Sequence, residues 1–122
     1  MRGTRTMYQG VLFRSLIERA WAEWFDGDGF HWLYEPVRFR DPKAPEGKGY
    51  TYTPDFQIGN IFIECKPLDS THFNNWHYCT APLLIIFGKP DRFHIRLHTQ
   101  AHGVIRGHYL SFQSAYTAAG LL

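Results

Sequence analysis

One short segment, residues 50–66, constrains the fold of this chain more than any other. Residues 50–58 and 60–66 each resemble a strand in their pattern of apolar and polar side chains, and the two runs meet at Gly59-Asn60. Alternation with a period of two is typical of β-strands, and a Gly-Asn pair suits a tight turn that requires positive φ angles. The sequence therefore predicts a β-hairpin, around which the rest of the chain must fold.

The predicted hairpin brings charged side chains together on one face. Alternate residues of a strand share a face, so Glu64 and Lys66 point the same way while Cys65 and its apolar neighbours point into the core. Asp55 lies on the opposite strand and can meet Glu64 across the pair. Two carboxylates and one ammonium group are therefore expected to converge.

This expected charge cluster would be costly for folding alone, because close carboxylates repel and burial disfavours their charged forms. A divalent cation would remove that conflict. Carboxylate oxygens suit Mg²⁺ or Mn²⁺, whereas the histidine and thiolate ligands that zinc prefers are missing from these positions. A metal beside a lysine supplies an activated water and positive charge against a phosphate. We therefore expect Asp55 and Glu64 to hold Mg²⁺ or Mn²⁺ and Lys66 to position an attacking water.

Hydrophobic patterns predict the elements around the hairpin. Apolar residues at three- and four-residue steps predict an amphipathic helix over residues 13–25. The apolar run 82–87 is typical of a strand at the centre of a sheet, and the alternation over 92–98 predicts a strand paired with it. The other predicted elements are strands over 31–39 and 104–112 and a short helix within 69–79. No repeat or long linker divides the chain, so we expect one domain over 1–122.

The spacing of the charged residues matches a known signature. Pro54-Asp55 precedes Glu64-Cys65-Lys66 by nine residues, and the helical pattern around Glu18 comes before both. This arrangement resembles the PD-(D/E)xK nuclease superfamily, whose members include restriction endonucleases, Holliday-junction resolvases, transposon-end nucleases and many phage nucleases. The resemblance extends from about residue 13 to residue 87.

The resemblance implies a fold and an active site. The implied fold is α/β with a restriction-endonuclease-like core, a mixed central β-sheet flanked by helices in the order α-β-β-β-α-β. The implied catalytic residues are Glu18, Asp55, Glu64 and Lys66. Glu18, Asp55, Glu64 and the backbone carbonyl of Cys65 would hold the metal, Mg²⁺ or Mn²⁺. The expected activity is metal-dependent endonucleolytic hydrolysis of DNA phosphodiester bonds.

Basic and polar residues around the predicted site are expected to contact DNA. The formal net charge of +2 permits a polyanionic partner without requiring one. The expected DNA contacts are Arg14, Lys48, Gln57 and Lys89.

Other interpretations remain open at this point. The charged strand face could carry an ordinary surface ion pair, and Glu18 could simply pair with Arg14 one helical turn earlier. A nuclease-like module that binds or scaffolds nucleic acid without catalysis, or a structure-specific junction resolvase, would fit the same residues. The segment from His72 to Cys79 lacks the ligand spacing of a zinc site. Trp32, Tyr34 and Tyr50 could be core residues or base-stacking platforms.

The expected setting is the cytoplasm of a bacterium or a phage-infected host cell. No apolar run approaches the roughly 18 residues of a membrane span, and the N-terminus lacks the apolar run of a signal peptide. Cys65 lies in an apolar run and suits a buried thiol better than a disulfide. Double-strand cleavage would require two sites and hence a homodimer, for which the segment from Gly103 onward is the expected interface.

Overall fold

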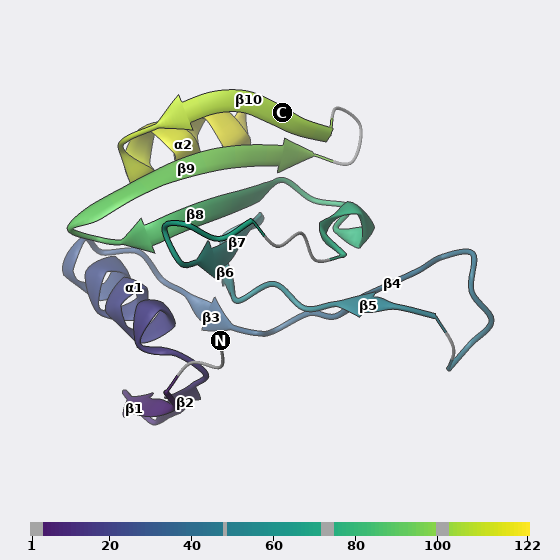
Figure 1. The fold of residues 1–122 in the computed structure, drawn as a ribbon, viewed down its shortest axis with the longest axis horizontal. Coiled ribbons are helices and arrows are strands. Elements are labelled where there is room, and N and C mark those ends of the chain that lie inside the picture. Colours follow the sequence, from purple (N-terminus) through teal and green to yellow (C-terminus); the bar gives the residue numbers. More distant parts are fainter. Residues whose placement is uncertain (1–3, 48, 72–74, 100–102) are drawn as a thin grey trace.

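The computed structural model describes residues 4–47, 49–71, 75–99 and 103–122. Its centre is a six-stranded mixed sheet in the order β10-β9-β8-β7-β6-β3 (Figure 1). Neighbouring strands are antiparallel except for β7 and β8, which are parallel. The strands are β3 (Leu33–Tyr34), β6 (Phe56–Ile58), β7 (Ile61–Lys66), β8 (Leu83–Lys89), β9 (Arg92–Thr99) and β10 (Gly103–Tyr109). The predicted mixed α/β architecture is thus confirmed.

Two helices pack on one face of this sheet. They are α1 (Leu16–Gly27) and α2 (Phe112–Gly120), and both contact β7 and β8 (Figure 1). Their buried side chains form one core with the sheet, in which Phe25 packs against Trp21, Phe56 and Phe112. Neither helix, within the part of the chain that the structure describes, has the length and apolar character to cross a bilayer.

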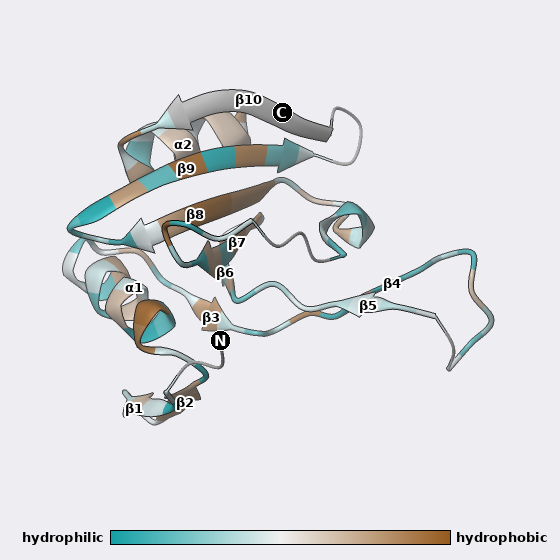
Figure 2. Cartoon of the chain, viewed as in Figure 1, coloured by the Kyte–Doolittle hydropathy of each residue, from teal (hydrophilic) through white to brown (hydrophobic). Residues whose placement is uncertain are grey.

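The other face of the sheet carries a second, smaller apolar cluster. Phe62, Leu83 and Ile85 project from β7 and β8 toward Trp76, which lies on a 3₁₀ turn, η1 (Trp76–Tyr78). In Figure 2 β8 is largely brown, in keeping with a strand buried on both faces. The pattern over 82–87 therefore predicted this strand and its central place correctly.

A narrow two-stranded arm extends from the sheet. It consists of β4 (Phe39–Arg40) and β5 (Thr51–Tyr52), which pair antiparallel and project well beyond the body of the molecule (Figure 1). At the opposite end, β1 (Thr6–Tyr8) and β2 (Val11–Phe13) form a small hairpin before α1. The arm and the body together frame the region where β6 and β7 carry the predicted site residues.

The predicted central hairpin is confirmed, although its strands are shorter than expected. β6 pairs with β7 in the register Phe56↔Ile63, and the turn contains Gly59 at φ +59°. Asn60 does not share this positive φ in the structure, which agrees with a two-residue turn that has glycine in its first position. Pro54 lies just before β6, so the expected strand over 50–58 is divided into β5 and β6.

Two other predicted boundaries were wrong. The helix begins at Leu16, not at residue 13, because Ser15 caps it by accepting from the Glu18 N–H and because Phe13 belongs to β2. The strand predicted over 31–39 is split into β3 and β4, since Glu35 adopts a left-handed φ of +49° and changes the chain direction.

The predicted order α-β-β-β-α-β is not what the described chain shows. Between β7 and β8 the described residues contain only η1, where a regular helix was expected, with residues 72–74 outside the description. The expected strand over 104–112 ends at Tyr109, and α2 follows it. Ser111 caps α2 by accepting from the Ser114 N–H, while Phe112, Ala115 and Ala119 bury its apolar face.

Replacement of Phe56 by alanine should severely weaken the fold. Its fully buried ring contacts Phe13, Phe25, Trp32 and Tyr34, and removing such a ring typically costs about 3–5 kcal/mol. Urea denaturation should show that loss in the free energy of unfolding for Phe56→Ala.

The matched control for this prediction is a large side chain on the surface. Met7 is 56% exposed on β1, so Met7→Ala should leave the free energy of unfolding within about 0.5 kcal/mol of the wild type. A loss below about 1 kcal/mol for Phe56→Ala would contradict the described core.

Candidate functional site

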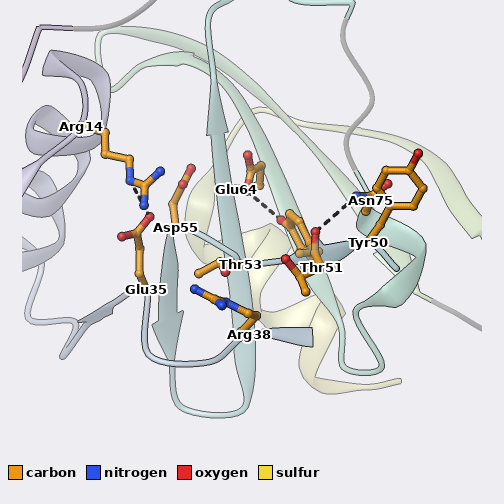
Figure 3. A pocket seen from close by; sticks show the side chains of 10 residues that line it. Arg14, Glu35, Arg38, Tyr50, Thr51, Thr53, Asp55, Glu64 and Asn75 are labelled. Carbon is orange, nitrogen blue, oxygen red and sulfur yellow. Dashed lines mark hydrogen bonds and ion pairs between the residues drawn. The ribbon is translucent and has the colours of Figure 1, made fainter. Parts of the chain in front are cut away.

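A polar pocket of about 570 Å³ opens between the sheet and the base of the arm (Figure 3). It is lined by residues from the β2–α1 connection, the β3–β4 connection, the arm, the β5–β6 connection, β7 and the residue before η1. The lining residues are Arg14, Glu35, Arg38, Tyr50, Thr51, Tyr52, Thr53, Asp55, Glu64 and Asn75. Two of the predicted metal ligands, Asp55 and Glu64, therefore share one pocket.

The hairpin register places Asp55 against the main chain of β7. Asp55 precedes β6 directly, and its Oδ2 accepts a hydrogen bond of 2.8 Å from the Cys65 N–H. Phe56 pairs with Ile63, so the same register continued by one step sets Asp55 opposite Glu64. The local alternation thus sends both carboxylates to the face away from the two helices.

Pro54 lies where the backbone pairing of β6 and β7 ends. Continuing the β6–β7 register would place Pro54 opposite Cys65. Proline has no N–H, so it cannot donate to the Cys65 carbonyl as an ordinary strand residue would. The N–H and C=O of one strand residue point to the same side, which directs the Cys65 carbonyl toward the Asp55 carboxylate. The thiol of Cys65 lies on the other face, within the helix-covered core.

Glu64 is held by two partners. The Tyr52 hydroxyl donates to Glu64 Oε1 at 2.7 Å, and Lys66 Nζ lies 3.4 Å from Glu64 Oε2. Only 5% of Glu64 is exposed. The expected neighbourhood of Glu64 and Lys66 is therefore present, and the ion pair is buried, unlike the surface pair that the alternative interpretation requires.

Glu18 lies beside this pair of carboxylates but does not line the pocket. Its Oε1 accepts from the Tyr34 hydroxyl at 2.5 Å and from the Arg14 N–H at 3.3 Å. Glu18 is buried, and its charge is close enough to act on both Asp55 and Glu64. It therefore belongs to the same electrostatic cluster, and its contact with Arg14 is through the Arg14 backbone, not through a helical ion pair.

Burial and mutual repulsion disfavour the ionised forms of all three acids. Burial raises the pKa of Glu18, and burial together with the charges of Glu64 and Glu18 raises the pKa of Asp55 well above its usual range. Burial also raises the pKa of Glu64 to about 7, although Tyr52 and Lys66 act against this rise. Three carboxylates with one neighbouring ammonium group therefore form a site that would gain from a further cation.

The donor chemistry of the site fits a hard divalent cation. Glu18, Asp55 and Glu64 offer carboxylate oxygens, and oxygen ligands of this kind suit Mg²⁺ or Mn²⁺. Among the described residues, however, no three acidic, histidine or cysteine side chains are grouped closely enough to hold an ion as they stand. Each acid is instead turned to its own hydrogen-bond partner, so binding would require side-chain rotation.

Glu35 and Arg38 line the pocket but were not among the predicted site residues. Arg14 Nε and Glu35 Oε2 form an ion pair of 3.0 Å at one side of the pocket (Figure 3). The Glu35 N–H also donates to the Asp55 carbonyl at 2.9 Å. Glu35 and Arg38 reach the pocket because the chain turns at the left-handed Glu35 and because the arm doubles back. The only signal for Glu35 was its place between Tyr34 and Pro36.

The predicted DNA contacts do not all lie at the pocket. Arg14 lines the pocket, whereas Gln57 and Lys89 do not. Gln57 Nε2 donates to the Gly59 carbonyl at the hairpin turn, and Lys89 lies at the end of β8. Lys48 lies outside the described residues. Cys79 packs in the second apolar cluster, where burial raises the pKa of its thiol to about 11.

Comparisons with family models, curated proteins and solved structures found no match to this chain. The chemistry of the pocket residues is therefore what bears on its function.

Removal of the Tyr52 hydroxyl should destabilise the protein. The Tyr52→Phe variant leaves Glu64 Oε1 without its buried donor, a change that costs about 1–3 kcal/mol. Chemical denaturation should show this loss, whereas Tyr50→Phe, at an exposed tyrosine on the same arm, should unfold at the wild-type midpoint. Equal midpoints for both variants would mean that the Tyr52–Glu64 bond contributes nothing.

Neutralisation of Asp55 should not destabilise the metal-free protein. The amide oxygen of Asp55→Asn can still accept from the Cys65 N–H, while the buried charge and its repulsion with Glu64 disappear. Urea denaturation in EDTA should therefore find the variant at least as stable as the wild type. A loss above about 1 kcal/mol would show that the ionised carboxylate serves mainly to hold the fold.

Proposed function

We propose that the chain is a metal-dependent endonuclease that hydrolyses DNA phosphodiester bonds with Mg²⁺ or Mn²⁺. One observation carries the proposal: the buried carboxylates of Asp55 and Glu64 share a pocket, and Lys66 Nζ lies 3.4 Å from Glu64. Buried carboxylates that lie close together lower the free energy of unfolding, and a bound cation would offset that loss. The PD-(D/E)xK resemblance and its nuclease core belong to the same proposal.

Each residue of the cluster has a distinct task in this proposal. Glu18, Asp55, Glu64 and the Cys65 carbonyl would hold the metal, which when bound supplies a more acidic water and positive charge against the phosphate. Lys66 holds the attacking water by a hydrogen bond and stabilises the charge that develops on the phosphate oxygens. Tyr52 orients Glu64 from the side opposite to Lys66.

The walls of the pocket support a phosphodiester substrate. Arg14 and Arg38 line it together with the two acids, so cationic side chains flank the expected metal position (Figure 3). Arginine suits phosphate because its planar guanidinium can donate two parallel hydrogen bonds. A small apolar substrate would find few complementary groups in this pocket.

The proposal also includes a setting and an assembly. Both cysteines are free and buried in the structure, which agrees with the reducing cytoplasm of a bacterium or a phage-infected host cell. If the protein cleaves both DNA strands, we expect a homodimer with two active sites; cleavage of one strand requires a single copy.

A cleavage assay tests the proposal directly. Supercoiled, linear duplex, single-stranded and four-way-junction DNA should be incubated with Mg²⁺, Mn²⁺ or EDTA. We expect metal-dependent cleavage that EDTA abolishes and that Glu64→Gln and Lys66→Met each reduce by about 100-fold or more, because each removes a group that acts on the metal or the phosphate. Circular dichroism should confirm that both variants are folded.

A matched pair on α1 separates the proposed ligand from an ordinary surface acid. Glu18→Gln should reduce cleavage by about 10-fold or more, since it removes a metal ligand. Glu23→Gln removes only an exposed pair with Arg19 on the same helix and should leave cleavage unchanged. Equal effects of the two variants would exclude Glu18 from the site.

The same assay distinguishes the two other hypotheses. Cleavage restricted to the four-way junction would assign a junction resolvase. Intact DNA under every condition, with folded protein that still binds it, would overturn the nuclease and assign a non-catalytic nucleic-acid-binding or scaffolding module.

A further inference from the structure

One exposed aromatic side chain stands beside the acidic pocket. Of the Phe, Tyr and Trp side chains that the structure describes, only Tyr50 is exposed, at 70%. Trp32 and Tyr34 instead pack against Phe13 and Phe56 in the core. The structure therefore separates three aromatic residues that the sequence left equivalent, because the Tyr50 side chain lies outside both apolar clusters.

Hydrogen bonds hold the main chain that follows this ring. The Tyr50 carbonyl accepts from the Asp41 N–H at 3.1 Å, and the next carbonyl, of Thr51, accepts from Asn75 Nδ2 at 3.2 Å. Tyr52 is buried and bonded to Glu64. The exposed ring therefore directly precedes β5 and lies two residues from a side chain that contacts the acidic cluster.

The ring and the charged groups occupy different sides of the same pocket. In Figure 3, Arg14 lies on one side, Tyr50 and Asn75 lie on the other, and Asp55 and Glu64 lie between them. A nucleotide has the same division, since its phosphate is anionic and its base has a flat apolar face. A phosphate near the acids and arginines would leave its base free to reach Tyr50.

The size of the pocket and the exposed ring of Tyr50 favour an unpaired base over a duplex. A pocket of about 570 Å³ lies within the range of single small-molecule sites, roughly 300–1,000 Å³, which is the scale of one nucleotide. In a duplex both faces of a base are covered by its stacked neighbours. Only an unpaired or extruded base can present a face to a side chain.

We propose that Tyr50 is a stacking platform for an unpaired base next to the scissile phosphate, so that the pocket takes single-stranded DNA or the single-stranded part of a branched DNA. This inference rests on the proposed function, because it names the substrate class of the same pocket. Tyr50 contributes binding and positioning, and it takes no part in activating the water.

Binding and stacking can be measured without cleavage. Wild-type protein, Tyr50→Phe and Tyr50→Leu would each be titrated in Ca²⁺ into three oligonucleotides that carry 2-aminopurine: a single strand, its duplex, and a duplex with a single-stranded flap. Anisotropy reports affinity, and 2-aminopurine fluorescence reports stacking. Tyr50→Phe keeps the ring and Tyr50→Leu keeps only apolar bulk, so this pair isolates the aromatic face.

We expect the wild type and Tyr50→Phe to bind the single strand and the flap alike and to quench 2-aminopurine, and we expect Tyr50→Leu to bind both about 10-fold more weakly with the quenching lost. Duplex binding should not change. Wild-type affinity for Tyr50→Leu, or an equal loss on duplex and single strand, would overturn the inference.

The failure of this inference is distinct from the failure of the proposed function. Cleavage by wild type and Tyr50→Leu at the same rate and with the same strand preference would exclude the stacking role of Tyr50 but leave the proposed nuclease activity intact. Base stacking on Tyr50 without any metal-dependent cleavage would support the stacking role of Tyr50 and exclude the proposed nuclease activity.

Discussion

The hydrogen bond from the Cys65 N–H to Asp55 Oδ2 connects the fold to the site. It forms just beyond the β6–β7 ladder, next to Pro54, which has no N–H with which to continue the pairing. The Asp55 carboxylate thereby satisfies the buried Cys65 N–H. The same bond fixes Asp55 near Glu64, and Glu64 in turn connects Tyr52 on the arm with Lys66 on β7.

The rest of the molecule offsets the energetic cost of burying these charged groups close together. The helix-covered core packs α1 and α2 on the sheet, and its apolar burial offsets the unfavourable burial of Glu18, Asp55 and Glu64. Tyr34, which packs against the helix-covered core, and Tyr52, in the second apolar cluster, donate to Glu18 and Glu64. Each acid thus has a donor in the absence of a ligand, which keeps the site ordered while its excess negative charge remains available to a cation.

The sequence predicted those features that depend on local periodicity. The β6–β7 hairpin, the central β8 and its partner β9 follow from alternation and from one apolar run, and they place Asp55, Glu64 and Lys66 correctly on one face. α2 was missed although its signals were present: Ser111 at the cap and apolar residues at Phe112, Ala115 and Ala119. The strand predicted over 104–112 ends at Phe112, the first residue of this helix, and no element was predicted after it.

Other features could not be predicted because they depend on long-range contacts. The left-handed φ of Glu35 breaks what looks like one strand, and no local pattern shows that the break returns Arg38 and Tyr50 to the pocket. The bonds from Tyr34 to Glu18 and from Tyr52 to Glu64 join residues 16 and 12 positions apart. Periodicity shows which face a side chain takes, but it does not show which distant side chain will meet it.

Direct measurement of metal binding tests the central claim most directly. Mn²⁺ would be titrated into wild-type protein and into a Glu64→Gln variant, with free Mn²⁺ followed by electron paramagnetic resonance and Mg²⁺ added as a competitor. The account predicts saturable binding to the wild type that Mg²⁺ displaces and that the variant loses. Wild-type protein that leaves all Mn²⁺ free, or a Glu64→Gln variant that binds it equally well, would contradict a metal site built on Asp55 and Glu64.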